Sequence, residues 1–447
     1  MFCSVDVVSG QELYRREEQP WAEFKQNLNQ LKQKQQHFAS LPVTARTAYL
    51  ITFAEKISAH RAQLAEMVCE EVGRCLRECE AELDKSVELI RYYAHLAPEL
   101  LANKTIATQA SLSQVRFEPL GVVLAVMPWN YPIWQVLRFA VPAICAGNAC
   151  VVKPAPSVAR VTTALFDLVG DKLPMIPAWL SNDETLKAIE SCDAMAFTGS
   201  TQTGRVLAAY AGAHLKKTVL ELGGSNAFIV LPDADMAQAT RDACYSRFRD
   251  AGQSCNAAKR IIVTEAAAEK FIPLFLAECA KLKTGNPKAA ATTLAPLHRA
   301  DLREKVHAQV LDAVSNGANC LLGGEMPEGE GWFYPATVLD GVNSRCRVYY
   351  EEVFGPVALL LRAKNEQEAV ELANDSPFGL GASIYTADHE KAWQYAEKIE
   401  AGSVFINRHT SSDLRLPFGG VKASGYGREL SEFGLYEFVN VKTYWQK

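Results

Sequence analysis

The sequence predicts an α/β protein in which parallel β-sheets are flanked by crossover helices. After Asn103, short β-branched segments alternate with helical ones at the spacing of strand–helix–strand units. A second block of the same alternation runs from about residue 227 to residue 420. The 447 residues suffice for two to three domains of about 150 residues each, and 49% of them are hydrophobic, enough for buried cores.

The first hundred residues are predicted to be mostly helical. Apolar residues from Trp21 and Phe24 onward recur at spacings of three and four, which is typical of a helix that buries one face. Further helices are expected over residues 44–72 and 75–96, with helix breaks at Pro42 and Pro98.

The alternating part then supplies strands and helices in turn. The expected strands are Val122–Val126, Ala149–Lys153, 194–197 and 218–221, and the expected helices are 132–145, 158–169 and 202–211. Two segments are predicted to be extensions of the body: the polar, alternating residues 105–118 and a strand in the tail from Glu437.

The composition excludes several classes of protein. Lys and Arg number 46 against 51 Asp and Glu, a net charge of −5, so no nucleic-acid partner is expected. No apolar run reaches the roughly 18–20 residues that span a bilayer, so no membrane segment is expected. The N-terminus lacks a secretory pattern and the 12 cysteines form no CxxC pair, which predicts reduced thiols and a cytoplasmic location. No metal site is expected.

Cys255 is the first candidate for chemistry. It follows Gly252-Gln253-Ser254 on a loop between a helix expected over 235–249 and a strand expected over Arg260–Thr264. Catalytic side chains are often placed on loops between rigid elements. A single cysteine is nevertheless far more often a buried structural thiol than a nucleophile, so the interpretation depends on its neighbours.

Two polar residues at the ends of predicted strands can serve that thiol. Glu221 ends an apolar strand, and the two glycines after it let a ligand approach closely. A partly buried glutamate has a raised pKa and can accept a proton. Asn130 follows strand Val122–Val126, where an amide can donate to a developing oxyanion. Taken alone, the glutamate has a less favoured alternative, a bond to nearby backbone amides, whereas the asparagine alone would be interpreted as the cap of a turn between prolines.

A glycine-rich turn follows the strand expected over residues 194–197. Residues 197–204, Phe-Thr-Gly-Ser-Thr-Gln-Thr-Gly, can present backbone N–H groups and a helix N-terminus to a phosphate. They match neither the dinucleotide motif GxGxxG nor a P-loop, because Arg205 follows Gly204. A P-loop NTPase is therefore disfavoured.

Six motifs in order resemble the aldehyde dehydrogenase superfamily over nearly the whole chain. They are Pro-Trp-Asn-Tyr-Pro at 128–132, Phe-Thr-Gly-Ser-Thr at 197–201, Leu-Glu-Leu-Gly-Gly at 220–224, Gly-Gln-Ser-Cys at 252–255, Glu-Glu-Val-Phe-Gly-Pro at 351–356, and Pro-Phe-Gly-Gly at 417–420 with Ser-Gly-Tyr-Gly-Arg-Glu at 424–429. One such motif can arise by chance, but six in this order are highly specific.

The resemblance implies a fold and a domain plan. It predicts an aldehyde dehydrogenase-like α/β fold with a Rossmann-type dinucleotide-binding domain (1–104 and 119–222) and an α/β catalytic domain (223–433). Residues 105–118 and 434–447 would form a small β oligomerisation extension. This extension resembles the strands through which family members form dimers or tetramers, so a homodimer or homotetramer is expected.

The resemblance also implies roles for the candidate residues. Cys255 resembles the nucleophile that adds to an aldehyde as a thiohemiacetal, and Asn130 with the N–H of Cys255 resembles the oxyanion hole. Glu221 resembles the base that activates water to hydrolyse the resulting thioester. A free thiol with a pKa of about 8.5 is only a few per cent thiolate at pH 7, so a base is needed.

The cofactor implied by the resemblance is NAD or NADP. The positions that match family contacts to the dinucleotide are Trp129, Lys153, Pro156, Gly199, Ser200, Leu222, Glu352 and Phe354. NAD-selective members often have a glutamate where this chain has Pro156, and that carboxylate repels a 2′-phosphate. Its absence favours NADP slightly and leaves NAD open. The segment 170–194 is shorter than the corresponding segment of most family members.

Two arginines and a serine indicate the class of aldehyde. Arg138 follows Asn130 by eight residues, a little over two helical turns, and Arg249 precedes Cys255 by six. Two arginines can hold a carboxylate through charge-assisted bonds. Arg138, Arg249 and Ser412 also match positions that succinate-semialdehyde dehydrogenases use for the substrate. Oxidation of succinate semialdehyde to succinate is therefore the leading hypothesis.

Other functions stay open at this point. Within the class, the alternative is another aldehyde, such as glutarate semialdehyde. A cysteine hydrolase would need an orienting histidine, and no Cys-His signature is recognisable. A non-catalytic binding protein is disfavoured because the nucleophile, the base and the oxyanion donor are all present.

Overall fold

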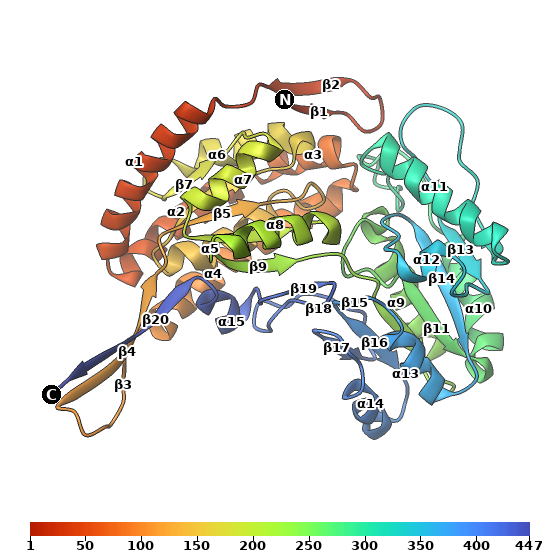
Figure 1. Cartoon of the computed structure of the whole chain (residues 1–447). Helices are drawn as coiled ribbons and strands as arrows, with labels where there is room; N and C mark the ends of the chain where they lie inside the picture. Colours follow the sequence, from red (N-terminus) through yellow and green to blue (C-terminus); the bar gives the residue numbers. More distant parts are fainter.

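The N-terminal part of the chain forms a hairpin followed by four helices. The computed structural model describes residues 1–447, and Figure 1 shows this part in red to orange. The elements are β1 (Phe2–Val5), β2 (Glu12–Arg16), α1 (Trp21–Ser40), α2 (Val43–Ala59), α3 (Arg61–Val72) and α4 (Leu76–Leu100). The sequence analysis did not anticipate the hairpin.

Two expectations for these helices are wrong. The single helix expected over 44–72 is divided at His60, whose φ of −105° and ψ of 14° interrupt the helical backbone. Pro98 does not break the helix but lies inside α4, near its end. A proline there removes one hydrogen bond, and the buried face of α4 holds the last turn in place.

The first large sheet has six strands in the order β19-β9-β8-β5-β6-β7. Adjacent strands in this sheet run parallel, except that β19 runs antiparallel to β9. The elements of this part are β5 (Val122–Val126), α5 (Trp134–Cys145), β6 (Ala149–Lys153), η1 (Pro156–Val158), α6 (Ala159–Val169), β7 (Met175–Pro177), α7 (Asn182–Ser191), β8 (Ala194–Thr198), α8 (Thr201–Ala213), β9 (Lys217–Glu221) and β19 (Gly425–Tyr426). The alternation predicted for this region is confirmed.

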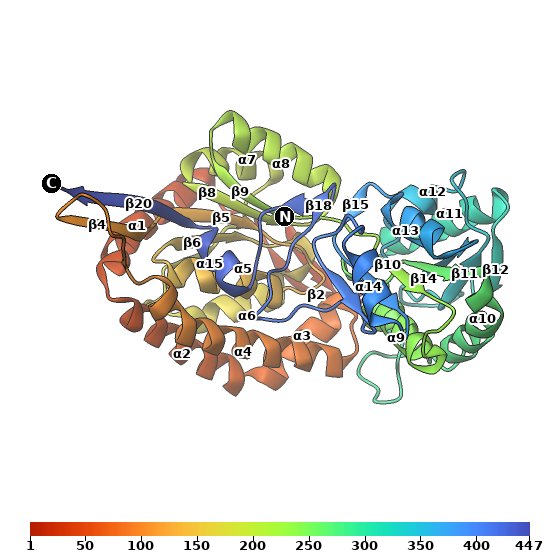
Figure 2. The same cartoon turned by 90° about the horizontal axis from the view of Figure 1, so that it is seen from below.

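Helices cover both faces of this sheet, which explains why its strands are apolar throughout. Alternate residues of a strand point to opposite faces. Val123 and Ala125 of β5 pack into a core with α2 to α6, whereas Val122 and Leu124 pack into a second core with α1, α7 and α8. Figure 2 shows α7 and α8 on one side of the strands and α2 to α6 on the other.

The second large sheet has seven strands in the order β12-β13-β14-β11-β10-β16-β17. All its pairs are parallel except β12 with β13. The elements are β10 (Ala227–Val230), α9 (Met236–Phe248), η2 (Arg249–Gly252), β11 (Arg260–Thr264), α10 (Glu265–Cys279), α11 (Ala300–Ser315), β12 (Asn319–Leu322), β13 (Thr337–Asp340), α12 (Arg347–Tyr350), β14 (Val357–Ala363), α13 (Glu366–Asn374), β16 (Ala382–Tyr385), α14 (His389–Ala396) and β17 (Val404–Ile406). A separate hydrophobic core packs around it.

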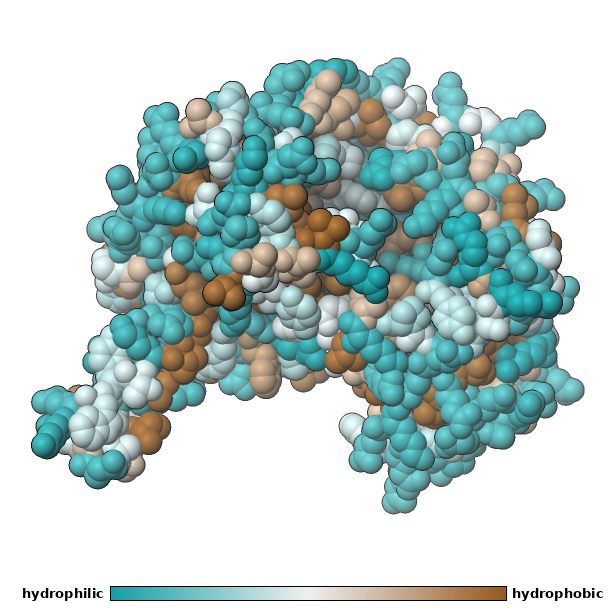
Figure 3. Space-filling model, in the orientation of Figure 1, coloured by the Kyte–Doolittle hydropathy of each residue, from teal (hydrophilic) through white to brown (hydrophobic).

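The two predicted extensions pair with each other in an arm that leaves the body. β4 (Leu112–Pro119) lies between β3 (Lys104–Thr105) and β20 (Val439–Gln446) in an antiparallel sheet. The arm projects in Figures 1 and 3, with hydrophobic patches on its surface. Its exposed apolar side chains are Ile106, Leu112, Val441 and Trp445. The remaining elements are β15 (Phe378–Gly379), β18 (Val421–Lys422) and α15 (Ser431–Tyr436).

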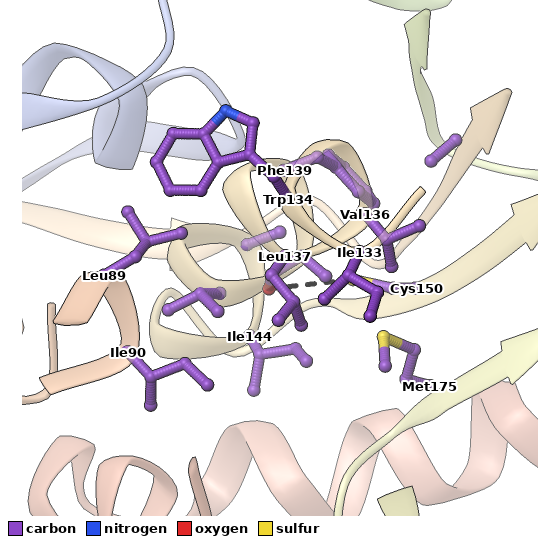
Figure 4. Packing of buried hydrophobic residues seen from close by; sticks show 14 of the residues in the cluster. Leu89, Ile90, Ile133, Trp134, Val136, Leu137, Phe139, Ile144, Cys150 and Met175 are labelled. Carbon is purple, nitrogen blue, oxygen red and sulfur yellow. Dashed lines mark hydrogen bonds between the residues drawn. The ribbon is translucent and has the colours of Figure 1, made fainter. Parts of the chain in front are cut away.

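Helix α5 positions the turn that carries Asn130. All 12 of its residues are buried, as expected for a helix that is apolar on nearly every side. Figure 4 shows Leu89 and Ile90 of α4 on one side of α5, with Cys150 of β6 and Met175 of β7 nearby. The start of α5 is therefore fixed at the carboxyl edge of the first sheet. No helix of the protein is both long and apolar enough to cross a membrane.

Candidate active site

Cys255 lines a cavity of about 600 Å³ between α4 and α5 on one side and α9 and η2 on the other. The backbone before it is strained. Asp250, Ala251 and Gly252 have φ values of 55°, 52° and 71°, in the left-handed region that aspartate and alanine rarely adopt. Arg74, on the loop between α3 and α4, donates to Asp250 Oδ1 at 2.6 Å and helps to hold this conformation.

Asn130 is tied directly to the loop of Cys255. Its Nδ2 donates to the carbonyl oxygen of Gln253 at 3.0 Å, and its side chain is buried. The neighbouring hydroxyl of Tyr131 donates to Asp250. The turn after β5 and the loop before β11 therefore form one hydrogen-bonded unit.

Lys259 also stabilises the loop of Cys255 through hydrogen bonds. The sequence analysis did not identify this lysine. Its fully buried Nζ donates to the carbonyl oxygen of Cys255 at 2.9 Å, to that of Gly224 at 2.6 Å and to Glu352 Oε1 at 2.6 Å. A lysine four residues after a cysteine has no pattern that predicts these contacts. It joins the Cys255 loop to the glycine turn after β9.

Glu221 ends β9 as a buried carboxyl without a hydrogen-bond partner on either oxygen. Burial raises its pKa well above the usual range, and the nearby Glu429 raises that pKa further, while Arg138 and Arg428 oppose the shift. A Cβ at Gly419 would lie 2.8 Å from Glu221 Oε1, so the glycine there leaves room for the carboxyl.

The thiol of Cys255 is neutral at pH 7. Burial raises its pKa to about 11, although the positive charges of Arg138 and Lys259 oppose the shift. Burial thus disfavours the charged form of both Cys255 and Glu221.

Arg138 is less available than the sequence suggests. Its Nε lies 2.5 Å from Glu429 Oε2, and both side chains are buried. Helix α5 begins only at Trp134, so helical spacing from Asn130 does not place Arg138, contrary to the expectation. Arg138 does line the cavity, and its role as an anion contact stays a prediction.

Arg249 and Ser412 line the cavity as well. Arg249 lies at the end of α9, as predicted, with its Nε 3.0 Å from Asp250 Oδ2. Ser412 accepts hydrogen bonds from Lys85 of α4 through its Oγ and, at 3.2 Å, through its carbonyl oxygen. Lys85 was missed. Buried Glu82 and Leu89, three residues before and four after it, place it beside the inner face of α4.

Comparison with known proteins identifies the family. The sequence model of the aldehyde dehydrogenase family matches residues 2–444. The chain belongs to the aldehyde dehydrogenase family. The succinate semialdehyde dehydrogenase Sad of Escherichia coli (strain K12), named as using NAD(P)+, is 43% identical over 409 residues, 90% of this chain and 88% of that protein.

Solved structures of aldehyde dehydrogenases superpose closely. The succinic semialdehyde dehydrogenase of Streptococcus pyogenes in complex with NADP+ gives a TM-score of 0.97 at 33% identity, covering 100% of this chain and 99% of that one. The betaine aldehyde dehydrogenase of Staphylococcus aureus in complex with NAD+ gives 0.95 at 29% identity, covering 99% and 91%. The protein thus has the aldehyde dehydrogenase fold and is an NAD(P)-dependent aldehyde dehydrogenase.

Residues at the carboxyl edge of the first sheet fit the dinucleotide of an aldehyde dehydrogenase. Gly199 and Ser200 precede α8, and Ser200 caps that helix by accepting the N–H of Thr203 at 3.2 Å. A helix N-terminus after a glycine suits a pyrophosphate. Lys153 ends β6, is buried and has no ion pair, and burial lowers its pKa to about 8. An unpaired buried cation suits a ribose or its phosphate.

The remaining predicted cofactor residues surround the glycine turn and the Asn130 turn. Glu352 accepts the N–H of Gly224 at 3.1 Å, and Leu222 packs on the glycine at position 204. Trp129 stacks on His298, with ring centroids 4.1 Å apart, and meets Phe354 edge-on at 5.7 Å. Pro156 begins η1, three residues after Lys153. His298 was not singled out from the sequence.

Proposed function

We propose that this aldehyde dehydrogenase oxidises succinate semialdehyde to succinate. The observation that carries the proposal is the concentration of cations around the cavity of Cys255, where Lys85, Arg138 and Arg249 face an interior that an acid-bearing aldehyde would enter. Buried or half-buried cations favour a substrate with a carboxylate at some distance from the reacting carbon. The printed names of the Escherichia coli and Streptococcus pyogenes relatives support the same substrate.

The reaction starts with Cys255. The Cys255 thiol releases its proton to water in the cavity, and the sulfur adds to the aldehyde carbon to form a thiohemiacetal. Negative charge develops on the former carbonyl oxygen, where the amide of Asn130 and the backbone N–H of Cys255 donate hydrogen bonds. Removal of one such donor typically costs about 10²–10³ in rate.

Glu221 completes the reaction. Bound NAD or NADP supplies the acceptor for the hydride whose loss turns the thiohemiacetal into a thioester. Glu221 in its ionised form takes a proton from water, whose oxygen adds to the thioester carbon. The carbon–sulfur bond breaks, succinate leaves as its carboxylate with release of a proton to solvent, and the proton held by Glu221 passes to the sulfur of Cys255. Glu221 is buried, whereas Cys255 is half-buried and open to the cavity through which the aldehyde and the attacking water reach it.

For the dinucleotide we propose a slight preference for NADP. Pro156 brings no carboxylate to the start of η1, and Lys153 supplies an unpaired cation close by in the chain. Both favour tolerance of a 2′-phosphate.

The exposed apolar residues of the β4–β20 arm support a homodimer or homotetramer, which light scattering would distinguish. Twelve free cysteines support a reducing, cytoplasmic location.

The test is a steady-state assay that follows reduced dinucleotide by its absorbance. NAD and NADP are each supplied with succinate semialdehyde, glutarate semialdehyde and butanal. We expect kcat/KM for succinate semialdehyde to exceed that for butanal by more than tenfold, because charged hydrogen bonds contribute roughly 1.5–3 kcal/mol each. Equal values for the two would reject an acid-bearing substrate, and a higher value for glutarate semialdehyde would replace the proposed one.

A variant without the nucleophile tests the chemistry itself. Cys255→Ala should abolish formation of reduced dinucleotide, with a melting temperature close to that of the unchanged protein. Cys320→Ala, which removes an exposed thiol outside the cavity, is the matched control and should keep full activity. Turnover that survives in Cys255→Ala would refute the assigned role of this cysteine.

A further inference from the structure

The cations that line the cavity differ in whether a carboxylate already neutralises them. Arg74 pairs with Asp250, Arg138 with Glu429, and Arg249 with Asp250 as well. Arg77 and Arg241 also line the cavity but are exposed to solvent. Lys85 is half-buried and, unlike the three paired arginines, has no carboxylate within 4.0 Å.

The surroundings of Lys85 hold its ammonium group in place without neutralising it. Its Nζ donates to the carbonyl oxygen and Oγ of Ser412 and lies 4.4 Å from the ring centroid of Trp134. An ammonium group has three N–H donors, so one is left after both bonds to Ser412. The aromatic face stabilises a cation but accepts no proton. Lys85, Trp134 and Ser412 all line the cavity.

We propose that Lys85 is the principal specificity-determining cation of this enzyme and binds the carboxylate of the aldehyde substrate beside Ser412. The inference rests on the proposed function and deepens it, because it moves the main acid contact from Arg138, which Glu429 already neutralises, to a lysine on α4. Arg249 shares Asp250 with Arg74 and contributes a smaller part of the positive charge.

The charges around Lys85 explain why an anionic substrate suits it. Burial lowers its pKa to about 8, and Arg138 on α5 and Arg249 on η2 lower that pKa further. Glu88 on α4 and Asp413, next to Ser412, oppose the shift only weakly. Lys85 is thus mostly charged at pH 7 and loses its proton above pH 8 in the free enzyme. A bound carboxylate stabilises the charged form.

The test compares an acid with a neutral substrate in matched variants. Lys85→Met keeps an unbranched side chain without the charge, and Lys85→Arg keeps the charge. Lys364→Met, at a lysine 78% exposed and outside the cavity, is the control. We expect the ratio of kcat/KM for succinate semialdehyde to that for butanal to fall at least tenfold in Lys85→Met, to recover largely in Lys85→Arg and to stay unchanged in Lys364→Met.

The pH dependence of KM is a second measurement, which a purely structural lysine would not change. In the unchanged enzyme, KM for succinate semialdehyde should rise between pH 8 and pH 9.5 relative to KM for butanal, because Lys85 loses its proton. In Lys85→Arg this relative rise should disappear. A flat ratio of the two KM values in the unchanged enzyme would overturn the proposal even if Lys85→Met failed to fold.

The two proposals fail in distinguishable ways. If the unchanged enzyme shows no preference for succinate semialdehyde over butanal, the proposed substrate is wrong. If it shows that preference and a folded Lys85→Met retains it within twofold, the proposed substrate stands and the role of Lys85 is wrong.

Discussion

Arg138 of α5 and Glu429 form a buried ion pair beside Glu221, the residue proposed as the base. The guanidinium Nε lies 2.5 Å from Glu429 Oε2, and Glu221 is buried beside this pair with no hydrogen-bond partner on either oxygen. Two carboxyl groups thus compete for the stabilising effect of one arginine. Because Glu429 holds the contact, its negative charge adds to the effect of burial, and both raise the pKa of Glu221.

Glu429→Gln should therefore lower the pKa of Glu221. The substitution removes a negative charge that raises this pKa and leaves Arg138 free to stabilise the ionised form of Glu221. A base with a lower pKa is deprotonated at lower pH, so the acid limb of the kcat–pH profile should move to lower pH. Glu432→Gln, the same change at an exposed residue of α15, is the control, and an unmoved limb in Glu429→Gln would contradict the coupling.

The same variant should lose stability. An arginine left buried without its partner costs on the order of 3–5 kcal/mol. Urea unfolding of Glu429→Gln, monitored by circular dichroism, should therefore show a lower midpoint than Glu432→Gln. An unchanged midpoint would mean that Arg138 finds a new partner, and Glu221 is the acid in position to be one.

The raised pKa of Cys255 predicts how its reactivity depends on pH. Because the pKa is about 11, the thiolate fraction at pH 7 is on the order of 10⁻⁴ and grows about tenfold with each unit of pH. Alkylation of Cys255 by iodoacetamide, followed by mass spectrometry of its peptide, should accelerate in that manner from pH 7 to pH 10. A rate that levels off below pH 9 would show that the free enzyme already holds a thiolate.

Lys259 is expected to be essential to the loop that it supports. Lys259→Met would leave the carboxylate of Glu352 and the carbonyl oxygens of Gly224 and Cys255 without their donor. The expected loss of stability is about 3–5 kcal/mol, measured by urea unfolding. The alkylation profile of Cys255 should also move to higher pH, because the charge of Lys259 lowers the thiol pKa.

Lys259→Arg provides the comparison for this prediction. It keeps the positive charge, so it should restore most of the alkylation profile even if the larger side chain costs stability. If Lys259→Met leaves the profile of Cys255 and the KM for the dinucleotide unchanged, the lysine acts on neither the thiol nor Glu352.

The sequence predicted the strands of the large sheets better than the contacts of the site. β5, β6 and β11 begin and end where expected, because a strand covered on both faces is a continuous apolar run between polar turns. The hairpin β1–β2 was missed because only four and five residues form its strands and its partner surface lies elsewhere in the chain.

Long-range pairs explain what was missed in the site. Asn130 and Cys255 were found because each stands in a recognisable local motif. Lys85 lies 327 residues from Ser412 in sequence, and nothing near either residue indicates that they meet. The neutralisation of Arg138 by Glu429 is hidden for the same reason, so a sequence can suggest a cation at a site without showing whether its charge is free.

Pro156→Glu should change the preference between the two dinucleotides. Pro156 is exposed at the first position of η1, three residues after the unpaired Lys153. A glutamate in the first turn of a helix is well tolerated, and no backbone N–H is needed there. Its carboxylate would accept from a ribose 2′-OH and repel a 2′-phosphate. We expect the ratio of kcat/KM for NADP to that for NAD to fall at least tenfold.

Two comparisons isolate the effect of the carboxylate at this position. Pro156→Gln has nearly the same size without the charge, so it should lower the ratio much less than Pro156→Glu. Pro327→Glu, at an exposed proline of a distant loop, should leave the ratio unchanged. If Pro156→Glu and Pro156→Gln behave alike, charge at residue 156 does not select the dinucleotide, and Lys153 becomes the residue on which the preference depends.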